Sequence, residues 1–157
     1  DGEIDLALGV FPTLAAPLCA EPLFEERFAC LADRDTLPAR GGLTLEEWLA
    51  RPHVLVAVRP GADNEIDLAL AAQGQQRRVA LALPHWAAAT EVIAGTDLLL
   101  TVARRSLEGR LSLKGLRCFE PPLPIRAFEF QQAWHERREG DAAHRWLRGR
   151  VMRACMA

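Results

Sequence analysis

The stretch over residues 77–105 constrains the fold of this chain more than any other. Residues 79–83 form an unbroken apolar run, which predicts a strand buried on both faces. Pro84 ends this run and suits the first turn of a helix, which we expect over residues 85–94. A second buried strand follows over residues 97–102. Because two strands joined by one helix form a right-handed βαβ unit, we expect a parallel sheet.

Ligands of such sheets gather where the carboxyl ends of strands meet helix N-termini. His85 stands at this position, directly after Pro84. A polar side chain and free backbone N–H groups at a helix N-terminus can hold a carboxylate or a phenolate. The alternative is a histidine that caps its own helix or faces solvent. The neighbouring Trp86 could line the site of an aromatic ligand or pack in the core.

The composition is that of a globular protein. The 157 residues suit one domain or two small lobes, and 50% of them are apolar while 25% are charged. The 19 basic and 21 acidic residues nearly balance, which argues against a surface built to neutralise many phosphates. The basic residues near the C-terminus are interleaved with acidic ones, which favours a solvated helix face.

The four cysteines show neither a CxxC pair nor a metal-like spacing; they are Cys19, Cys30, Cys118 and Cys155. We therefore expect reduced thiols in a cytoplasmic protein, with no disulfide framework, no metal site and no cofactor. The sequence has no apolar run of membrane-spanning length and no signal peptide at its start, so we expect no membrane association. It also opens without a methionine and runs straight into a predicted strand, which suggests a fragment of a longer protein.

Elsewhere the chain alternates strands and helices. Strands are predicted over residues 5–10, 24–32, 53–58, 116–120 and 126–135, and helices over residues 43–50, 64–72, 106–111 and 142–153. The expected N-caps of three of these helices are Thr44, either Asp63 or Asn64, and Asp141. Residues 13–21 are expected to be irregular, and periodicity alone leaves 24–32 open to a helix. The predicted apolar face of the last helix comprises Ala143, Trp146, Leu147, Val151 and Met152.

One hexapeptide, EIDLAL, occurs twice, over residues 3–8 and 65–70. A duplication would explain it, but the flanking residues of the two copies do not match, so a chance recurrence is the better interpretation. Because local propensity is weak, context decides the structure of each copy. We expect the first copy to be a strand and the second a helix.

Several segments in this order resemble the effector-binding domain of LysR-type transcriptional regulators: GEIDLALG, HVLVAV, RRVALALPH, AGTDLLLTVARR and WHERREGDAAHRWLR. The resemblance implies an α/β fold of the type II periplasmic-binding-protein kind, with two lobes of mostly parallel sheets and an effector in the cleft. Residues 1–53 and 119–157 would form an incomplete first lobe with the hinge strands, and 54–118 the second lobe. The family also carries an N-terminal winged helix-turn-helix that binds DNA, which this sequence does not contain.

The resemblance also extends the set of candidate effector-binding residues beyond Pro84, His85 and Trp86. It adds a turn after the first strand, the end of the strand after residue 53, and the chain crossing at the hinge: Gly9, Val10 and Phe11; Val58 and Arg59; Pro121 and Pro122. Phe11 could contact the effector or pack against the hinge. Arg59 could pair with an anionic effector or remain solvated.

The leading hypothesis is therefore a module that senses a small aromatic or carboxylate effector and assembles as a homodimer or tetramer. A solute-binding protein of the same fold is the first alternative. An enzyme is the second, but the sequence has no GxSxG, HExxH or glycine-rich phosphate loop, so no catalytic residue is assigned.

Overall fold

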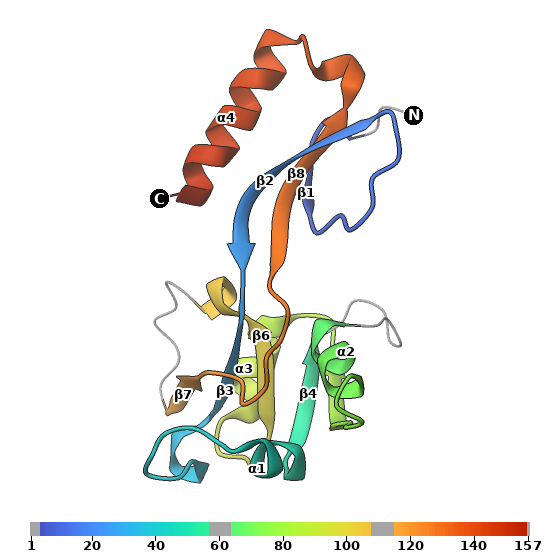
Figure 1. Ribbon diagram of the computed structural model, residues 1–157. Coiled ribbons are helices and arrows are strands. Elements are labelled where there is room, and N and C mark those ends of the chain that lie inside the picture. The colour runs from blue at the N-terminus through green and yellow to red at the C-terminus, as the bar shows by residue number, and fades with distance from the viewer. Residues whose placement is uncertain (1–3, 57–63, 108–114, 157) are drawn as a thin grey trace. The chain divides into compact units, whose positions relative to one another are not determined.

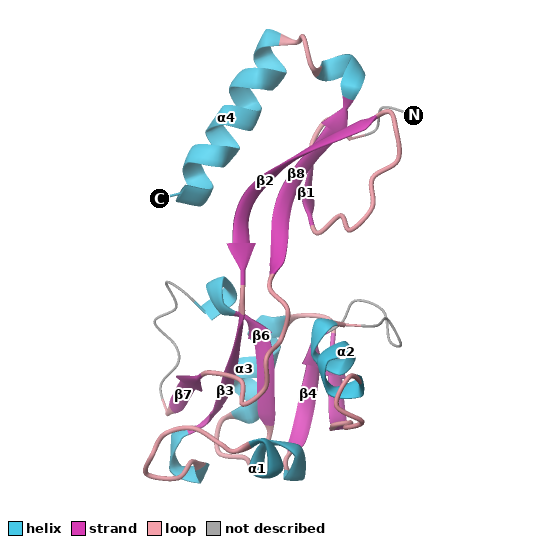
Figure 2. Ribbon diagram, viewed as in Figure 1, coloured by secondary structure: helices cyan, strands magenta, loops and turns pink. Residues whose placement is uncertain are grey.

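The computed structural model describes residues 4–56, 64–107 and 115–156 (Figure 1). The chain divides into two compact units: a first unit of residues 1–26 and 127–157, and a second unit of residues 27–126. Both units combine strands with helices (Figure 2).

The second unit contains a five-stranded sheet in the order β5-β4-β6-β3-β7. Its strands are β3 (Phe28–Asp33), β4 (Pro52–Val56), β5 (Arg78–Leu83), β6 (Leu99–Ala103) and β7 (Leu116–Phe119), and its helices are α1 (Leu45–Ala50), α2 (Glu65–Ala71) and α3 (Trp86–Ile93), with 3-10 helices at Arg34–Thr36 and Arg104–Leu107. The predicted strand, helix and strand of residues 77–105 are confirmed as β5, α3 and β6. Pairing is parallel only between β4 and its neighbours β5 and β6, whereas β3 runs antiparallel to β6 and β7. The expectation of mostly parallel sheets thus holds for three strands of this unit.

The prediction that residues 79–83 are buried on both faces is wrong. Because β5 is an edge strand of the sheet, its residues are exposed or half-buried, and Val79 is 41% exposed. Leu81 and Leu83 still pack against the core. An unbroken apolar run does not distinguish a central strand from an edge strand, because the strand order is set by contacts distant in sequence.

Two apolar clusters cover the two faces of this sheet. Successive strand residues point to opposite faces, so Leu31 and Leu100 join a cluster with α3, while Cys30 and Leu99 join a cluster beneath α1 and α2. The second cluster is centred on Trp48 of α1, which is fully buried. The sheet is therefore enclosed by helices on both faces, as α/β folds require.

The predicted starts of α1 and α2 are confirmed. Thr44 and Glu47 form a capping box, with the Thr44 hydroxyl accepting from Glu47 N at 3.3 Å and the Glu47 carboxylate accepting from Thr44 N at 2.7 Å. The side chain of Arg40 and this backbone bond lower the pKa of Glu47 to about 2. Asn64 caps α2, whereas Asp63, the other predicted cap, lies outside the described residues.

The boundaries between the two units differ from those expected. The contacts divide the chain after residues 26 and 126, rather than after residues 53 and 118. The physical reason is that β3 lies between β6 and β7 in the sheet, and α1 packs beneath it. Leu123 is buried in the same cluster as Trp48, which also places the segment after β7 in the second unit.

The first unit is an antiparallel sheet in the order β1-β8-β2, contacted by α4. Its elements are β1 (Ala7–Gly9), β2 (Leu18–Glu26), β8 (Phe128–His135), a 3-10 helix (Glu136–Arg138) and α4 (Ala142–Met156). The strand predicted over 24–32 is confirmed as parts of β2 and β3. However, β2 begins at Leu18, within the segment expected to be irregular.

The two copies of the hexapeptide have different structures, as expected. The second copy forms α2, whereas the first contributes only Ala7 and Leu8 to β1, with Asp5 in a bend before the strand. The strand is therefore shorter than the predicted span of residues 5–8.

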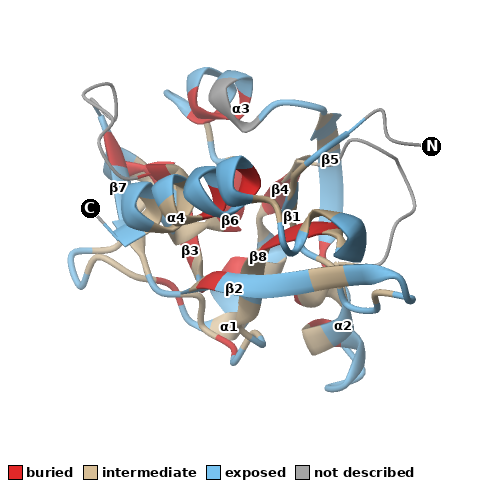
Figure 3. Cartoon of the chain, turned by 90° about the horizontal axis from the view of Figure 1, so that it is seen from above, coloured by how far each residue is buried: buried red, intermediate tan, exposed pale blue. Residues whose placement is uncertain are grey.

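The buried face of α4 is polar, and the predicted apolar face is wrong. The expected cap is present, since Asp141 accepts from Ala143 N at 2.9 Å and from His144 N at 3.1 Å. However, Trp146 is 66% exposed, while His144 and Arg148 are buried. Figure 3 shows α4 as largely exposed, with a short buried part. Which face of a helix is buried depends on the groups that it packs against. Here α4 packs against the Trp134 ring and the carbonyl oxygen of Asp5, which suit Arg148 and His144.

Arg148 holds α4 against β8 and connects it to β1. Its guanidinium carbon lies 4.1 Å from the centre of the Trp134 ring, and Nη1 lies 3.0 Å from His144 Nδ1. The guanidinium only donates, so His144 Nδ1 accepts and its Nε2 donates to the carbonyl oxygen of Asp5 at 2.8 Å. The helix thereby fixes the residues that lead into β1.

We expect Arg148→Ala to lower the unfolding free energy of the first unit by about 1–3 kcal/mol, because it removes a cation–π contact and leaves a buried imidazole nitrogen unpaired. Hydrogen exchange of the amides in β8 and α4 measures this change. Arg150→Ala is the matched control, because Arg150 is an exposed arginine of the same helix. Equal protection in the two variants would show that the Arg148 contacts contribute nothing.

Candidate functional site

His85 lies at the N-terminus of α3, where the sequence predicted a ligand. It is the N-cap residue, with φ −131° and ψ 122°, and its side chain makes no capping hydrogen bond. The imidazole is exposed, as is Pro84 before it. The interpretation of His85 as a side-chain cap is therefore wrong, and the first-turn N–H groups receive no side-chain cap. Such a terminus carries partial positive charge and favours anions.

The parallel pairing of β4 and β5 brings two predicted segments to one edge of the sheet. Val56 pairs with Leu83, so both strands end at the same level. Pro84 follows β5 at this edge. Val58 and Arg59, which follow β4 in sequence, lie outside the described residues, and the structure does not describe the side chain of Trp86.

The other end of α3 is fixed by β3, and this holds the helix in position. Gly95 has φ +71°, the left-handed conformation that suits glycine, and its N–H donates to Asp33 Oδ2 at 2.6 Å. The backbone N–H groups of Gly95 and then Asp35 lower the pKa of Asp33, so its carboxylate stays ionised. Ala89 and Ile93 are fully buried against the sheet, which orients the N-terminus of α3.

Pro121 and Pro122 follow β7 and are half-buried in the second unit. Just before them, Glu120 pairs with Arg104 at the end of β6, and Arg104 N donates to the carbonyl oxygen of Arg27 at 2.7 Å. Leu123 is buried just beyond the prolines. These contacts tie the predicted crossing segment to the carboxyl end of β6.

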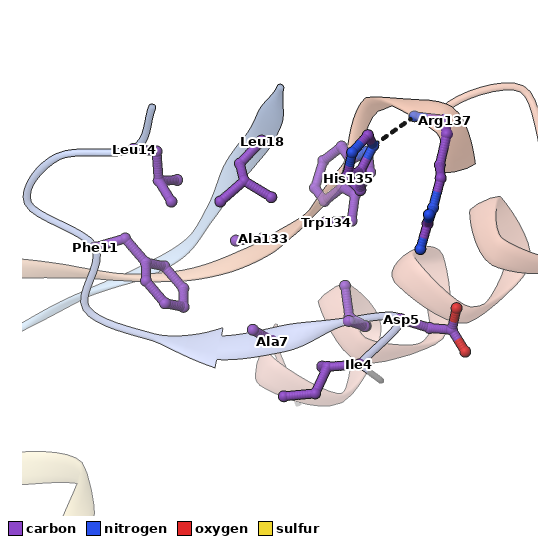
Figure 4. A pocket seen from close by; sticks show the side chains of 11 residues that line it. Ile4, Asp5, Ala7, Phe11, Leu14, Leu18, Ala133, Trp134, His135 and Arg137 are labelled. Carbon is purple, nitrogen blue, oxygen red and sulfur yellow. Dashed lines mark hydrogen bonds between the residues drawn. The ribbon is translucent and has the colours of Figure 1, made fainter. Parts of the chain in front are cut away.

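The remaining predicted residues, Gly9, Val10 and Phe11, lie in the first unit, which contains a pocket of about 370 Å³ (Figure 4). Phe11 lines this pocket, together with Leu14, Leu18 and Trp134. The Phe11 ring packs closely on Gly9, where an added Cβ would lie 3.3 Å from the ring. Val10 is 48% exposed.

The polar residues of this pocket were not identified from the sequence. Asp5, His135 and Arg137 line it. His135 Nδ1 accepts from Arg137 N at 3.2 Å, which fixes the imidazole at the end of β8. The pocket depends on β1 lying beside β8, a contact between segments more than a hundred residues apart. The only available signal was the position of Trp134 and His135 at a strand end.

Within the described residues, no group of three or more His, Cys, Asp or Glu side chains is arranged to hold a metal ion. No helix among them is long and apolar enough to cross a bilayer. Cys30 is fully buried, and burial raises the pKa of its thiol to about 11, so it stays protonated.

Comparison with known families decides the classification. The model of the LysR substrate binding domain matches residues 1–156. The chain belongs to this family. It is 30% identical over 148 residues to the transcriptional activator NahR of Pseudomonas putida, and 29% identical over 149 residues to the regulator LinR of Sphingobium indicum. In both cases the match covers 94% of this chain and 49% of the relative, so the chain spans about half the length of these regulators.

The fold agrees with this classification. The regulatory domain of MexT, a transcriptional activator in Pseudomonas aeruginosa, superposes with a TM-score of 0.83 at 32% identity, covering 96% of this chain and 72% of that one. This LysR domain thus has the periplasmic-binding-protein-like fold expected from the resemblance. Its relatives are transcriptional regulators rather than transport proteins, so the solute-binding alternative is set aside.

Proposed function

We propose that this LysR effector-binding domain senses a small carboxylate, such as an aromatic acid, at the N-terminus of α3. The observation that carries the proposal is the uncapped first turn of α3, with exposed His85 at the carboxyl edge of the parallel strands. The N–H groups would bind the carboxylate and the imidazole would donate to it. The same role, contact with the effector, is proposed for Pro84, Trp86, Val58 and Arg59.

We expect His85→Ala to weaken the binding of such an effector by about 1–3 kcal/mol, the scale of a lost charge-assisted hydrogen bond. Calorimetric titration with acids selected by a thermal-shift screen measures the dissociation constant. Glu91→Ala is the control, because Glu91 is exposed on the same helix and distant from its N-terminus. A folded His85→Ala variant that binds as tightly as the wild type would remove His85 from the site.

We also propose as effector contacts five residues of the first unit and of the crossing segment: Gly9, Val10, Phe11, Pro121 and Pro122. Phe11 is the most informative of these, because it lines a pocket together with other apolar side chains. Titration of Phe11→Ala with the same acid tests this contact separately from His85.

For the whole protein we propose a cytoplasmic regulator that binds DNA through a winged helix-turn-helix outside this chain. The relatives support this, because they are named HTH-type regulators and this chain spans about half their length. The near balance of 19 basic and 21 acidic residues also favours DNA contact elsewhere in the protein.

We further propose that the protein assembles as a homodimer or tetramer. In the first unit, β1 is an edge strand and several large apolar side chains are exposed, among them Ile4, Leu8, Val10 and Leu18. Exposed apolar edges recruit further strands. We expect light scattering of this 157-residue chain to give a mass above that of the monomer. A monomer with slow amide exchange over residues 5–32 would contradict the proposal.

A further inference from the structure

His53 of β4 is fully buried and has one ring nitrogen without a partner. Its Nε2 lies 2.9 Å from the carbonyl oxygen of Trp48, which can only accept, so Nε2 carries the hydrogen. Burial lowers the pKa of this imidazole to about 4, and the ring is therefore neutral near pH 7. Nδ1 is then a bare acceptor, and no atom of the described residues donates to it.

Arg77 has a buried donor without an acceptor, where His53 has a buried acceptor without a donor. Its side chain is 1% exposed, and Nε and Nη2 donate to the Asp67 carboxylate at 2.7 Å and 3.0 Å. Nη1 is buried and contacts no acceptor among the residues that the structure describes. Leaving a charged donor without a hydrogen bond is costly, and buried polar groups are nearly always paired with protein or ordered water.

His53 belongs to β4, and Arg77 directly precedes the neighbouring strand β5. His53 pairs with Val79 in the parallel ladder of β4 and β5. Arg77 lies two residues before Val79, and alternate residues of an extended chain point to the same face. The guanidinium therefore extends over the face that carries the imidazole. In agreement, Arg77 has the largest effect among the charges that lower the pKa of His53.

We propose that one buried water molecule bridges Arg77 Nη1 and His53 Nδ1, accepting from the first and donating to the second. An anion would satisfy the guanidinium but meet the lone pair of Nδ1, and a cation would satisfy Nδ1 but meet the guanidinium. Only a group that both accepts and donates suits the two nitrogens. The burial of both side chains limits that group to the size of water, and buried waters typically make two to four such bonds.

The bridge would connect all three elements on this face. Arg77 is bonded to Asp67 of α2 and to the α2 cap Asn64, and His53 is bonded to α1 through Trp48. The water would thus join the start of α2 to β4 and α1. The bridge would lie in the interior of the second unit and would form whether or not an effector is bound.

A crystal structure of the 157-residue protein at about 1.5 Å resolution tests the proposal directly. The expected result is a solvent peak within about 3.2 Å of both nitrogens. A direct bond between Nη1 and Nδ1, or a protein atom bonded to either nitrogen in place of solvent, would overturn it.

Nitrogen-15 NMR of the His53 ring provides a second test in solution. The wild type should show the nitrogen-15 chemical shift of a hydrogen-bonded Nδ1 and magnetisation transfer from water to the ring. In Arg77→Met this transfer should be lost, and the chemical shift of Nδ1 should move to the value of a nitrogen without a hydrogen bond. Arg78→Met is the matched control, because Arg78 is the exposed neighbour. If Arg77→Met leaves both signals unchanged, or if the wild type shows no water transfer, the bridge does not exist.

Discussion

Trp48→Ala is expected to lower the unfolding free energy of the second unit by about 3–5 kcal/mol, the range for removing a fully buried tryptophan. Trp48 is 0% exposed, its indole N–H donates to Cys30 Sγ at 3.3 Å, and its ring lies 4.0 Å from the His53 ring, between centroids. The substitution would open a cavity beneath α1 and α2 and remove one of the two hydrogen bonds of the buried Cys30 thiol, which also bonds to Thr101 Oγ1. Urea unfolding followed by circular dichroism measures the change.

Trp146→Ala is the matched control for this prediction, because it removes the same side chain from a position that is 66% exposed. We expect it to change the unfolding free energy by less than about 0.5 kcal/mol. Similar losses in the two variants would mean that Trp146 is covered in solution or that Trp48 is not in the core.

The second large effect is a loss of stability on acidification. His53 has a pKa of about 4 in the folded protein against 6.5 for the unperturbed group. The main cause is burial, which disfavours the charged form of the imidazole. The hydrogen bond to the Trp48 carbonyl opposes this effect in part, and the positive charge of Arg77 adds to it. The unfolded chain therefore binds more protons, and stability falls as the pH drops below the unfolded value. Lowering the pH from 7 to 5 should cost about 2 kcal/mol through this group alone.

The loss of stability between pH 7 and 5 distinguishes His53 from the carboxylates whose pKa is lowered, which include Asp33 and Glu47. Their stabilising effect is present above their unfolded pKa and is lost only at lower pH. Unfolding free energies of the wild type and His53→Phe at pH 5, 6 and 7 isolate the contribution. Parallel pH profiles for the two proteins would show that His53 remains charged in the fold or is not buried.

The local features of the fold were predictable because they depend on neighbours in sequence. Thr44 and Asn64 start helices through side chains three residues from the groups they bind. The flanks of the two hexapeptides likewise sufficed to assign different structures. The order of the strands depends on pairings distant in sequence, so β5 was taken for a central strand and β3 was placed in the wrong unit.

The same distinction applies to the candidate site and to α4. The position of His85 at a helix N-terminus followed from Pro84 and the apolar run before it. The pocket beside Phe11 was not predictable, because it requires β1 to lie against β8. In α4, the face with Trp146 was predicted to be buried because its side chains are the most apolar of the helix. The face with His144 and Arg148 is buried instead, because Arg148 packs on the Trp134 ring of β8 and donates a hydrogen bond to His144 Nδ1.

The nesting of one unit inside the other has a consequence for the order of folding during synthesis. Every strand, helix and core residue of the second unit lies between residues 27 and 126, so the unit can fold as soon as this segment has left the ribosome. The first unit must wait, because Leu18 pairs with His135 and the loop between them contains the whole second unit. A finished second unit holds the ends of that loop in a compact body, which reduces the entropy cost of closing it. A nascent chain arrested before β8 would therefore carry one folded unit and a β2 strand still without its partner.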